Sequence, residues 1–289
     1  MIDPLRLLLG WILSLGVGGV AWWRGSLTVS GAVGAVIVGT LTFGFGGWPW
    51  GLTLVTFFVS SSLLSHYKER LKEERAGEKF AKGGRRDLTQ AMANGGLGAL
   101  LSLLSALLGE PPLVLACFVG TMAAATADTW ATELGVLSTS PPRLVTTWRT
   151  VEPGTSGGIT LVGTLASAAG GLTIGLAMFS FLPLVQALIP AAPPPPPSLL
   201  VSPSPWLLWL LPAGLLGGVA GSLADSLLGA TVQAMYRTPD GKETERAVGK
   251  DGTPNSLVRG APWLTNDVVN FLGSVAGGVV GGGVFLLMA

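Results

Sequence analysis

Four acidic side chains lie inside, or at the edge of, stretches that are otherwise apolar enough to cross a membrane. They are Asp128, Glu133, Asp225 and Asp267, and a fifth, Asp87, opens a further apolar stretch. An ionisable group within a span costs at least about 2.5 kcal/mol to insert, so it normally faces a partner or a water-filled cavity. Carboxylate oxygens are ligands that Mg²⁺ prefers, and substrate phosphates usually complete its coordination shell. We therefore expect a Mg²⁺ site whose ligands are Asp128, Asp225 and Asp267.

The position of each acid within its span separates structural from chemical roles. Asp87 and Asp267 begin their stretches, where the helix dipole stabilises a carboxylate, so a structural role explains each of them singly. Asp128 and Asp225 lie near the C-terminal ends of theirs, where negative charge is disfavoured. Hydrogen bonding between helices explains those two poorly. We predict that they are catalytic, together with Glu133.

Other polar side chains surround the acids at helical spacing. Asn94 falls on the same helical face as Asp87, and Asn270 follows Asp267 by three residues, so each pair can present oxygen atoms to one point. Polar support is expected from Asp87, Asn94, Thr129, Ser226 and Asn270.

A glycine-rich segment, residues 152–158, precedes another apolar stretch. Its glycines allow successive backbone N–H groups to point at one anion, and the N-terminus of the following helix adds partial positive charge. The segment lacks the Gly-Lys-Ser/Thr ending of a Walker A loop. A plain turn before a helix is the alternative. The phosphate-binding residues expected here are Gly154, Thr155, Ser156, Gly157 and Gly158.

Basic residues near these segments are candidates for further phosphate contacts. Arg85 and Arg86 follow a Gly-Gly pair directly, and a guanidinium group suits bidentate contact with phosphate. The alternative is that the two arginines only fix membrane orientation. Arg149, before the glycine-rich segment, and Lys250, in the long loop 237–265, complete the expected phosphate-binding set.

The elements that position these residues are membrane-spanning helices. Only 11% of the 289 residues are charged and the mean hydropathy is +0.59, whereas soluble domains are about 25% charged, so a compact soluble fold is excluded. A span needs about 20 apolar residues. Stretches of that length lie near 5–23, 27–45, 48–64, 88–108, 112–134, 157–182, 206–230 and 267–287. We predict an all-α, polytopic transmembrane bundle of about eight spans that forms one domain, residues 1–289.

The distribution of basic residues predicts the orientation of this bundle. With eight spans, 16 of the 17 Lys and Arg residues fall on one side and only Arg6 falls on the other. The positive side is expected to be cytoplasmic, with both termini external, in a bacterial-type inner membrane or its plastid-derived equivalent. The expected cytoplasmic loops are 65–87, 135–156 and 231–266. The external loop 183–205 contains the run Pro193–Pro197, which should be extended.

Two short sequence matches suggest internal repeats. Ala127-Asp128-Thr129 and Ala224-Asp225-Ser226 lie 97 residues apart in two spans that run in the same direction. This spacing favours two parallel repeats around a shared site. A single Cys and a single His exclude a disulfide framework and a Cys/His metal cage, and a net charge of +1 argues against nucleic acid as a partner.

Three segments resemble a known family: residues 84–96, residues 127–135 (ADTWATELG) and residues 152–158 (EPGTSGG). The chain resembles the integral-membrane family that includes the plastid phytyl-phosphate kinase of tocopherol synthesis, from about residue 5 to the C-terminus. The resemblance implies transfer of phosphate from a nucleoside triphosphate, with CTP the expected donor, to a prenyl monophosphate such as phytyl phosphate. The product would be a prenyl diphosphate, made at the cytoplasmic face with Mg²⁺. Membrane lipid is a further partner, and a homo-oligomer is left open.

Two other functions use the same residues. A CTP-dependent lipid-phosphate cytidylyltransferase would direct attack at the α-phosphate of the donor. A cation-coupled secondary transporter would use the acids for ion binding, but its site is expected near the middle of the membrane rather than toward one face.

Overall fold

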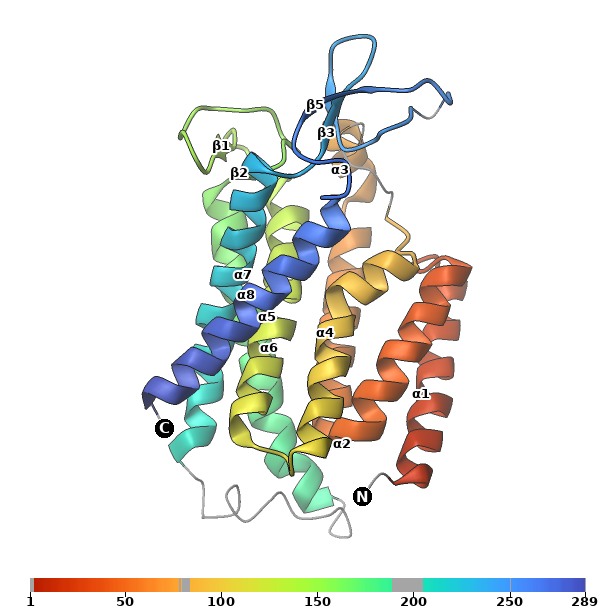
Figure 1. The fold of residues 1–289 in the computed structure, drawn as a ribbon, viewed down its shortest axis with the longest axis vertical. Helices are drawn as coiled ribbons and strands as arrows, with labels where there is room; N and C mark the ends of the chain where they lie inside the picture. The colour runs from red at the N-terminus through yellow and green to blue at the C-terminus, as the bar shows by residue number, and fades with distance from the viewer. Residues whose placement is uncertain (1–2, 78, 80–83, 189–204, 250, 289) are drawn as a thin grey trace.

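The computed structural model describes residues 3–77, 79, 84–188, 205–249 and 251–288. Within them, seven helices are long and apolar enough to cross a membrane. They are α1 (Pro4–Trp23), α2 (Val29–His66), α4 (Leu88–Leu107), α5 (Pro112–Gly135), α6 (Leu161–Leu188), α7 (Leu210–Thr231) and α8 (Asn266–Met288). A short helix, α3 (Glu69–Ala76), joins α2 to α4. The predicted polytopic helical bundle is confirmed (Figure 1).

Helix α2 turns back on itself and therefore supplies two of the expected spans. Gly47 interrupts it with φ 75° and ψ −167°, a conformation that favours glycine. A straight helix of its 38 residues would be about 57 Å long. Instead, the His66 Nε2 atom at its end lies 3.0 Å from Ser26 Oγ, just before its start. The seven helices thus account for eight crossings, as the hydropathy pattern predicts.

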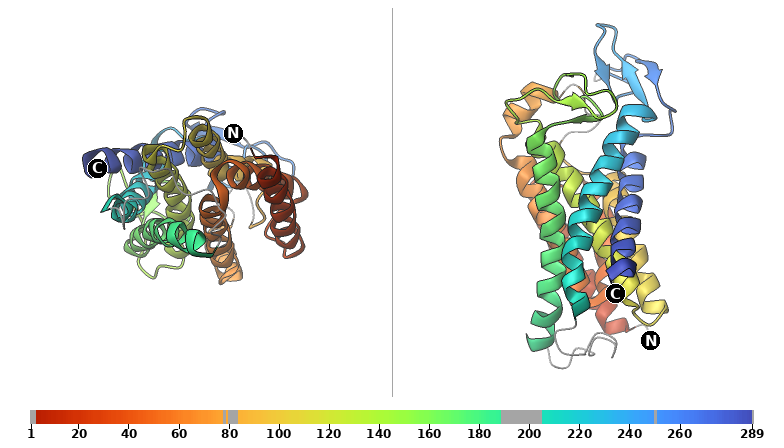
Figure 2. Two further views of the ribbon diagram at one scale, coloured as in Figure 1. Left: turned by 90° about the horizontal axis from the view of Figure 1, so that it is seen from below. Right: turned by 90° about the vertical axis from the view of Figure 1, so that its left-hand side faces the viewer.

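The connections at one end of the bundle form two small antiparallel sheets. One pairs β1 (Arg143–Leu144) with β2 (Gly158–Ile159). The other has the order β4-β3-β5 and consists of β3 (Met235–Arg237), β4 (Glu243–Thr244) and β5 (Ser256–Arg259). Figure 2 shows both sheets at the end opposite the two termini. The two termini therefore share one side of the bundle, as predicted.

Close packing of glycines sets the register of the central helices. A Cβ atom on Gly217 of α7 would lie 2.8 Å from Gly120 Cα of α5, and one on Gly277 of α8 would lie 2.6 Å from the Gly120 carbonyl oxygen. These backbones can approach so closely only because the contact residues are small. Helices α5 and α7 pack in parallel with an offset of 97 residues, which also places Asp225 beside Asp128. The repeated segments therefore lie at one level, and their origin by duplication stays a prediction.

Two loop boundaries differ from those predicted. Helix α6 continues through Pro183 to Leu188, so residues 183–188 are helical rather than part of the external loop. The predicted loop 65–87 is partly helical: α2 continues to His66, the helix breaks at Tyr67 and Lys68, and α3 follows; φ of Lys68 is 52°. The run Pro193–Pro197 lies outside the described residues.

Candidate active site

A polar cavity of about 680 Å³ opens at the end of the bundle that carries the small sheets. Its walls come from the five helices α4 to α8, from α3 and the end of α2, and from the loops at this end of the bundle. Of the residues predicted from sequence, the cavity is lined by Arg86, Asn94, Asp128, Thr129, Glu133, Gly154, Thr155, Ser156, Gly157, Gly158, Asp225, Ser226, Asp267 and Asn270. Segments far apart in the sequence therefore share one site.

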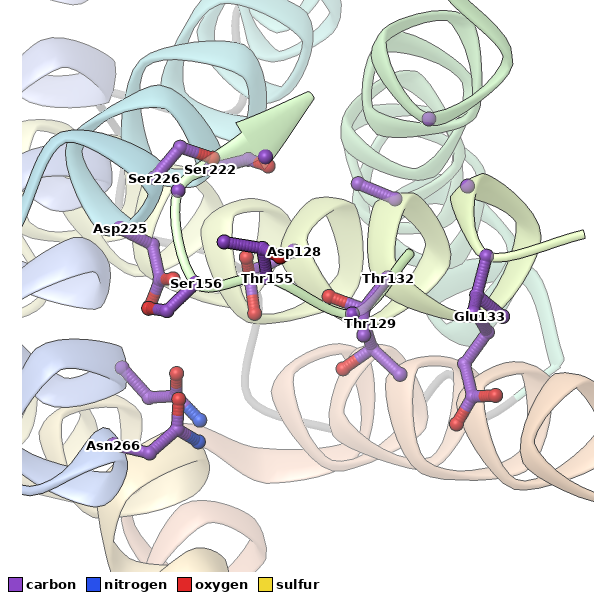
Figure 3. Close-up of a pocket in the computed structure, with 18 of the residues that line it drawn as sticks. Asp128, Thr129, Thr132, Glu133, Thr155, Ser156, Ser222, Asp225, Ser226 and Asn266 are labelled. Atoms are coloured by element: carbon purple, nitrogen blue, oxygen red, sulfur yellow. The ribbon is translucent and has the colours of Figure 1, made fainter. Parts of the chain in front are cut away.

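The two predicted catalytic aspartates lie on neighbouring helices in this cavity. Figure 3 shows Asp128 on α5 and Asp225 on α7, with Thr155 and Ser156 of the glycine-rich segment beside them. Both are half-buried and line the same cavity, so the two carboxylates repel each other when both are ionised. With its amide nitrogen facing Asp225, Asn270 of α8 donates a hydrogen bond of 2.8 Å to Oδ2. A cation between the two carboxylates would remove this repulsion.

The other two aspartates are joined through one hydroxyl group. Thr89 Oγ1 lies 2.8 Å from Asp267 Oδ2 and 2.9 Å from Asp87 Oδ1. Asp87 is the N-cap of α4 and accepts a hydrogen bond of 3.0 Å from the Gln90 N–H, so it has the structural role that its place at a helix start allows. Asp267 lines the cavity at the start of α8.

The carboxylates available as ligands limit how a metal ion could bind in this cavity. Among the described residues, no three His, Cys, Asp or Glu side chains are grouped closely enough to hold a metal ion. The expected cluster of Asp128, Asp225 and Asp267 is therefore not assembled, because Asp267 is held apart at the α4–α8 contact. Two carboxylates still match the usual requirement of Mg²⁺, which proteins hold through one or two carboxylates and substrate phosphates.

The glycine-rich segment forms a turn that packs against the end of α7. Gly154 and Gly157 adopt φ values of 77° and 81°. Ser156 Oγ donates a hydrogen bond of 2.9 Å to Gln233 Oε1, and Lys79 Nζ donates one of 3.1 Å to Thr155 Oγ1. Two residues outside the turn, Gln233 and Lys79, therefore hold it against the cavity wall.

The turn differs from a simple anion-binding helix start in two respects. The N–H groups of Thr155 and Gly158 already donate within the turn, to the carbonyl oxygens of Glu152 and Thr155. In addition, β2 separates the turn from α6, and Thr160 Oγ1 accepts the Gly163 N–H at 2.9 Å. The predicted direct contribution of the α6 N-terminus is therefore weakened, because a side chain caps that helix.

Arg86 is the predicted arginine that reaches the cavity. Its Nη1 atom is buried and has no hydrogen-bond partner among the described residues. The guanidinium carbon lies 5.6 Å from the ring centre of Phe57 and 5.9 Å from that of Phe58. Its carbonyl oxygen accepts the Thr28 N–H at 2.9 Å, and a Cβ atom on Gly31 would lie 2.0 Å from that oxygen. Gly31 thus allows the close approach that positions Arg86.

A family model described as integral membrane protein DUF92 matches residues 12–278. The chain belongs to the DUF92 family of integral membrane proteins. It is 33% identical over 280 residues to Protein PGR of Arabidopsis thaliana, which covers 92% of each chain. It is 30% identical over 251 residues to an uncharacterised membrane protein of Methanocaldococcus jannaschii, covering 87% of this chain and 82% of the relative. An uncharacterised membrane protein of Synechocystis is 25% identical over 265 residues, covering 89% of this chain and 82% of the relative.

The resemblance to an integral-membrane family, inferred from sequence, is thus confirmed at the level of the family. No match was found among solved structures. The motifs that carried the resemblance, around Asp128 and around Gly157, are the parts of this DUF92 chain that meet in the polar cavity.

Three basic residues predicted to bind phosphate are not among the described lining of the cavity. Arg85 Nη2 donates a hydrogen bond of 3.1 Å to the Leu27 carbonyl oxygen, so its side chain is directed toward the α1–α2 connection. Arg149 is exposed, in the hairpin before the glycine-rich turn. Lys250 lies outside the described residues.

Glu133, predicted to be catalytic, is held by groups that the sequence did not single out. The buried Lys72 of α3 forms an ion pair with it, and Ser65 Oγ donates a hydrogen bond of 2.6 Å to its Oε1 atom. Lys72 also donates to the carbonyl oxygens of Leu64 and Ser65, at 2.7 Å each. Lys72 therefore joins the end of α2 to α5.

Three loop residues that the sequence analysis did not single out, Lys79, Gln233 and Glu245, connect the loops that border the cavity. Lys79 forms an ion pair of 2.8 Å with Glu152, and its carbonyl oxygen accepts the Glu245 N–H at 2.9 Å. The buried Gln233 donates a hydrogen bond of 2.9 Å to Glu245 Oε1. The 65–87 and 231–266 loops thus both contact the glycine-rich turn. These residues lie far apart in the sequence and share no helical or strand periodicity, so their contacts cannot be predicted from the sequence alone.

Gly157→Ala is expected to destabilise the glycine-rich turn. The left-handed backbone costs a non-glycine residue roughly 1–2 kcal/mol, and the added Cβ atom would lie 2.4 Å from Ala230 Cβ. Gly252→Ala is the matched control, since φ there is 84° but no atom lies within 4 Å. Thermal unfolding and hydrogen exchange of residues 152–158 in the two variants measure the difference. Equal losses in both would show that contact with α7 is unimportant.

Because of the Lys79–Glu152 ion pair, we expect the stability of the glycine-rich turn to depend on pH. The hydrogen bond from Lys79 holds the pKa of the Glu152 carboxyl below its usual value. Because the pKa is lowered in the folded state, the pair stabilises the turn at neutral pH and is lost only as pH falls below the ordinary glutamate range. Hydrogen exchange of residues 152–158, measured against pH, should show this loss. In Glu152→Gln the corresponding pH dependence should be absent.

Proposed function

We propose that this DUF92 protein transfers the terminal phosphate of a nucleoside triphosphate to a prenyl monophosphate in the membrane. CTP and phytyl phosphate are the proposed donor and acceptor. One observation carries the proposal: Asp128 and Asp225, the glycine-rich turn and Arg86 line a single cavity at one end of a membrane bundle. Paired carboxylates, hydroxyl groups and an arginine are the groups that phosphoryl transfer requires.

The proposed roles follow from where each group lies. Asp128 and Asp225 would hold Mg²⁺ on the donor phosphates, and the bound ion would neutralise the negative charge that develops during transfer. Thr155 and Ser156 would contact the donor phosphates through their hydroxyl groups and the turn's backbone. Arg86 would bind the phosphate of the acceptor.

The reaction requires no general base. An ionised oxygen of the acceptor phosphate attacks the γ-phosphorus of the donor, and the bond between that phosphorus and the β–γ bridging oxygen breaks. The electron pair leaves with the nucleoside diphosphate, so no proton is released or taken up when both partners are fully ionised. Alignment and charge neutralisation then provide the catalysis. This agrees with a cavity whose polar wall contains carboxylates, hydroxyls and amides.

We propose that the cavity faces the cytoplasm. The end of the bundle that contains it carries the basic loops, which are expected to remain on the cytoplasmic side. A cavity on that side is open to nucleotide. Its position at one end of the bundle also favours an enzyme over a transporter, whose site would be expected near the middle of the membrane.

The test is product analysis with the purified full chain. Phytyl phosphate, CTP and Mg²⁺ should give phytyl diphosphate and CDP, and phytol should give no product. Pyrophosphate and a CDP-lipid would instead establish a cytidylyltransferase. Uptake of solute by proteoliposomes without nucleotide, together with no product from any nucleoside triphosphate, would overturn the enzymatic proposal.

A further inference from the structure

A second cavity, of about 90 Å³, lies among α1, both halves of α2, and α4. Its wall is almost entirely apolar. Representative lining residues are Val17, Ala35, Val38, Val55, Ala91 and Gly95. Water gains little from a narrow space with so few polar partners, so this cavity suits an aliphatic group.

The apolar cavity meets the polar one at three residues of the α4 region. Arg86, Gln90 and Asn94 line both cavities. Gln90 and Asn94 are one turn apart on α4, and Arg86 precedes that helix by two residues. A molecule with a polar head and an apolar chain could therefore occupy both spaces at once, with its head at this junction.

The group at the junction is a cation that forms no ion pair with a described residue. Arg86 Nη1 is buried without a hydrogen-bond partner among the described residues, and the guanidinium lies over the rings of Phe57 and Phe58. An unpaired N–H donor of a buried charged group is costly, and a bound anion would satisfy it. Phosphate suits it because its oxygens can accept two parallel hydrogen bonds from a guanidinium.

We propose that the cavity among α1, α2 and α4 binds the first carbons of one aliphatic chain whose terminal phosphate is held by Arg86. The inference rests on the proposed function, since it assigns this place to the phosphate acceptor. Its phosphate would then project into the polar cavity that Asp128 and Asp225 line. The lipid is a single-chain monophosphate.

The size and exposure of the cavity support this choice of lipid. An engineered protein cavity of about 150 Å³ holds one benzene molecule, so a cavity of about 90 Å³ holds a short part of one chain and not two chains side by side. Leu13 and Val17, which line it on α1, are 37% and 38% exposed, so protein atoms do not cover them completely. The remainder of the chain can leave past them into the bilayer.

Ala35→Phe tests the site by filling the cavity. Binding is measured on the purified full chain without nucleotide, using phytyl phosphate, phytol, inorganic phosphate and phosphatidic acid as separate probes. Ala35→Phe is expected to weaken phytyl phosphate binding roughly tenfold or more and to leave CTP binding unchanged. Val33→Phe is the matched control, because Val33 lies on the same helix and is 52% exposed on its outer face. It should bind phytyl phosphate as the unmodified chain does.

Arg86→Gln tests the phosphate contact independently of the chain. It should weaken phytyl phosphate binding roughly tenfold to a hundredfold and remove the preference for phytyl phosphate over phytol. Phosphatidic acid, which has two chains, should compete poorly with phytyl phosphate. Equal binding by the Ala35 and Val33 variants, or equal competition by phosphatidic acid, would overturn the proposal.

A photo-crosslinking measurement keeps the proposal testable if Ala35→Phe does not fold. Phytyl phosphate with a photoreactive group near the phosphate end should label segments of α2 and α4, and labelling confined to α6 and α7 would overturn the proposed site. Because these measurements need no turnover, they are separate from the test of the kinase. Specific binding without phosphate transfer would support the lipid site and contradict the proposed reaction.

Discussion

Replacing Asp128 or Asp225 with Asn should strongly reduce the proposed phosphate transfer and leave the bundle at least as stable as before. The two carboxylates are half-buried on adjacent helices that line one cavity, and they repel each other when both are ionised. Asparagine keeps the shape of the side chain and removes one of the two charges, so the free energy of unfolding should stay constant or rise. The same change removes a charged ligand for the donor's metal and should reduce turnover by about two to three orders of magnitude.

The combination of lost activity and retained stability is the informative result. Turnover is measured as product formed from CTP and phytyl phosphate, and stability as the thermal midpoint in detergent without nucleotide. Asp240→Asn is the matched control, since Asp240 is an exposed loop carboxylate between β3 and β4. A large drop in the thermal midpoint of Asp128→Asn and Asp225→Asn would instead show that the two acids are structural. Turnover like that of the unmodified chain would remove them from the mechanism.

Lys72→Ala should have the largest effect on stability. Lys72 is buried, its ion pair with Glu133 joins α3 to α5, and the Glu133 side chain is only 21% exposed. Removing the lysine leaves that carboxylate without its counter-charge, which costs about 3 kcal/mol or more for a buried pair. The carbonyl oxygens of Leu64 and Ser65 lose a donor as well. The thermal midpoint of the purified variant should fall accordingly.

A second substitution at the same pair tests the role of Glu133. Adding Glu133→Gln to Lys72→Ala removes the unpaired charge, so part of the lost stability should return, while the two carbonyl oxygens remain without Lys72. Lys72→Arg is the control, because arginine keeps the positive charge and a side chain of similar length. If the double variant is stable but inactive, Glu133 is catalytic as its sequence context predicts. If it is stable and active, the Lys72–Glu133 pair only fixes the cavity wall.

Much of the site's layout could be predicted from local features of the sequence. The spans are detectable because the hydrocarbon core demands about 20 apolar residues and penalises each charge within them. That penalty is also what makes Asp128 and Asp225 conspicuous. Their spacing of 97 residues is also the offset between Gly120 of α5 and Gly217 of α7, which lie against each other. Small residues at this contact let the two backbones approach closely, and this fixes the register of the two helices.

The contacts between loops could not be predicted. Lys79 and Gln233 secure the glycine-rich turn, yet in the sequence Lys79 is one of a series of basic residues and Gln233 is an isolated amide. Lys79 and Gln233 meet their partners Thr155 and Ser156 only because the ends of the helices bring three separate loops together. Side-chain contacts also decide that the three aspartates of the expected metal set are not grouped among the described residues, since Asp267 at the start of α8 contacts Thr89 of α4.

The sequence by itself determined the membrane-spanning architecture, the end of the bundle at which the acids gather, and the segments that meet there. Insertion cost and helical period act within one segment, so both can be recognised from residue order alone. Only the tertiary structure decided that Arg86 rather than Arg85 reaches the cavity, that Glu133 pairs with Lys72, and that an apolar cavity adjoins the site. These depend on side-chain direction and on the packing of distant helices, which no local pattern specifies.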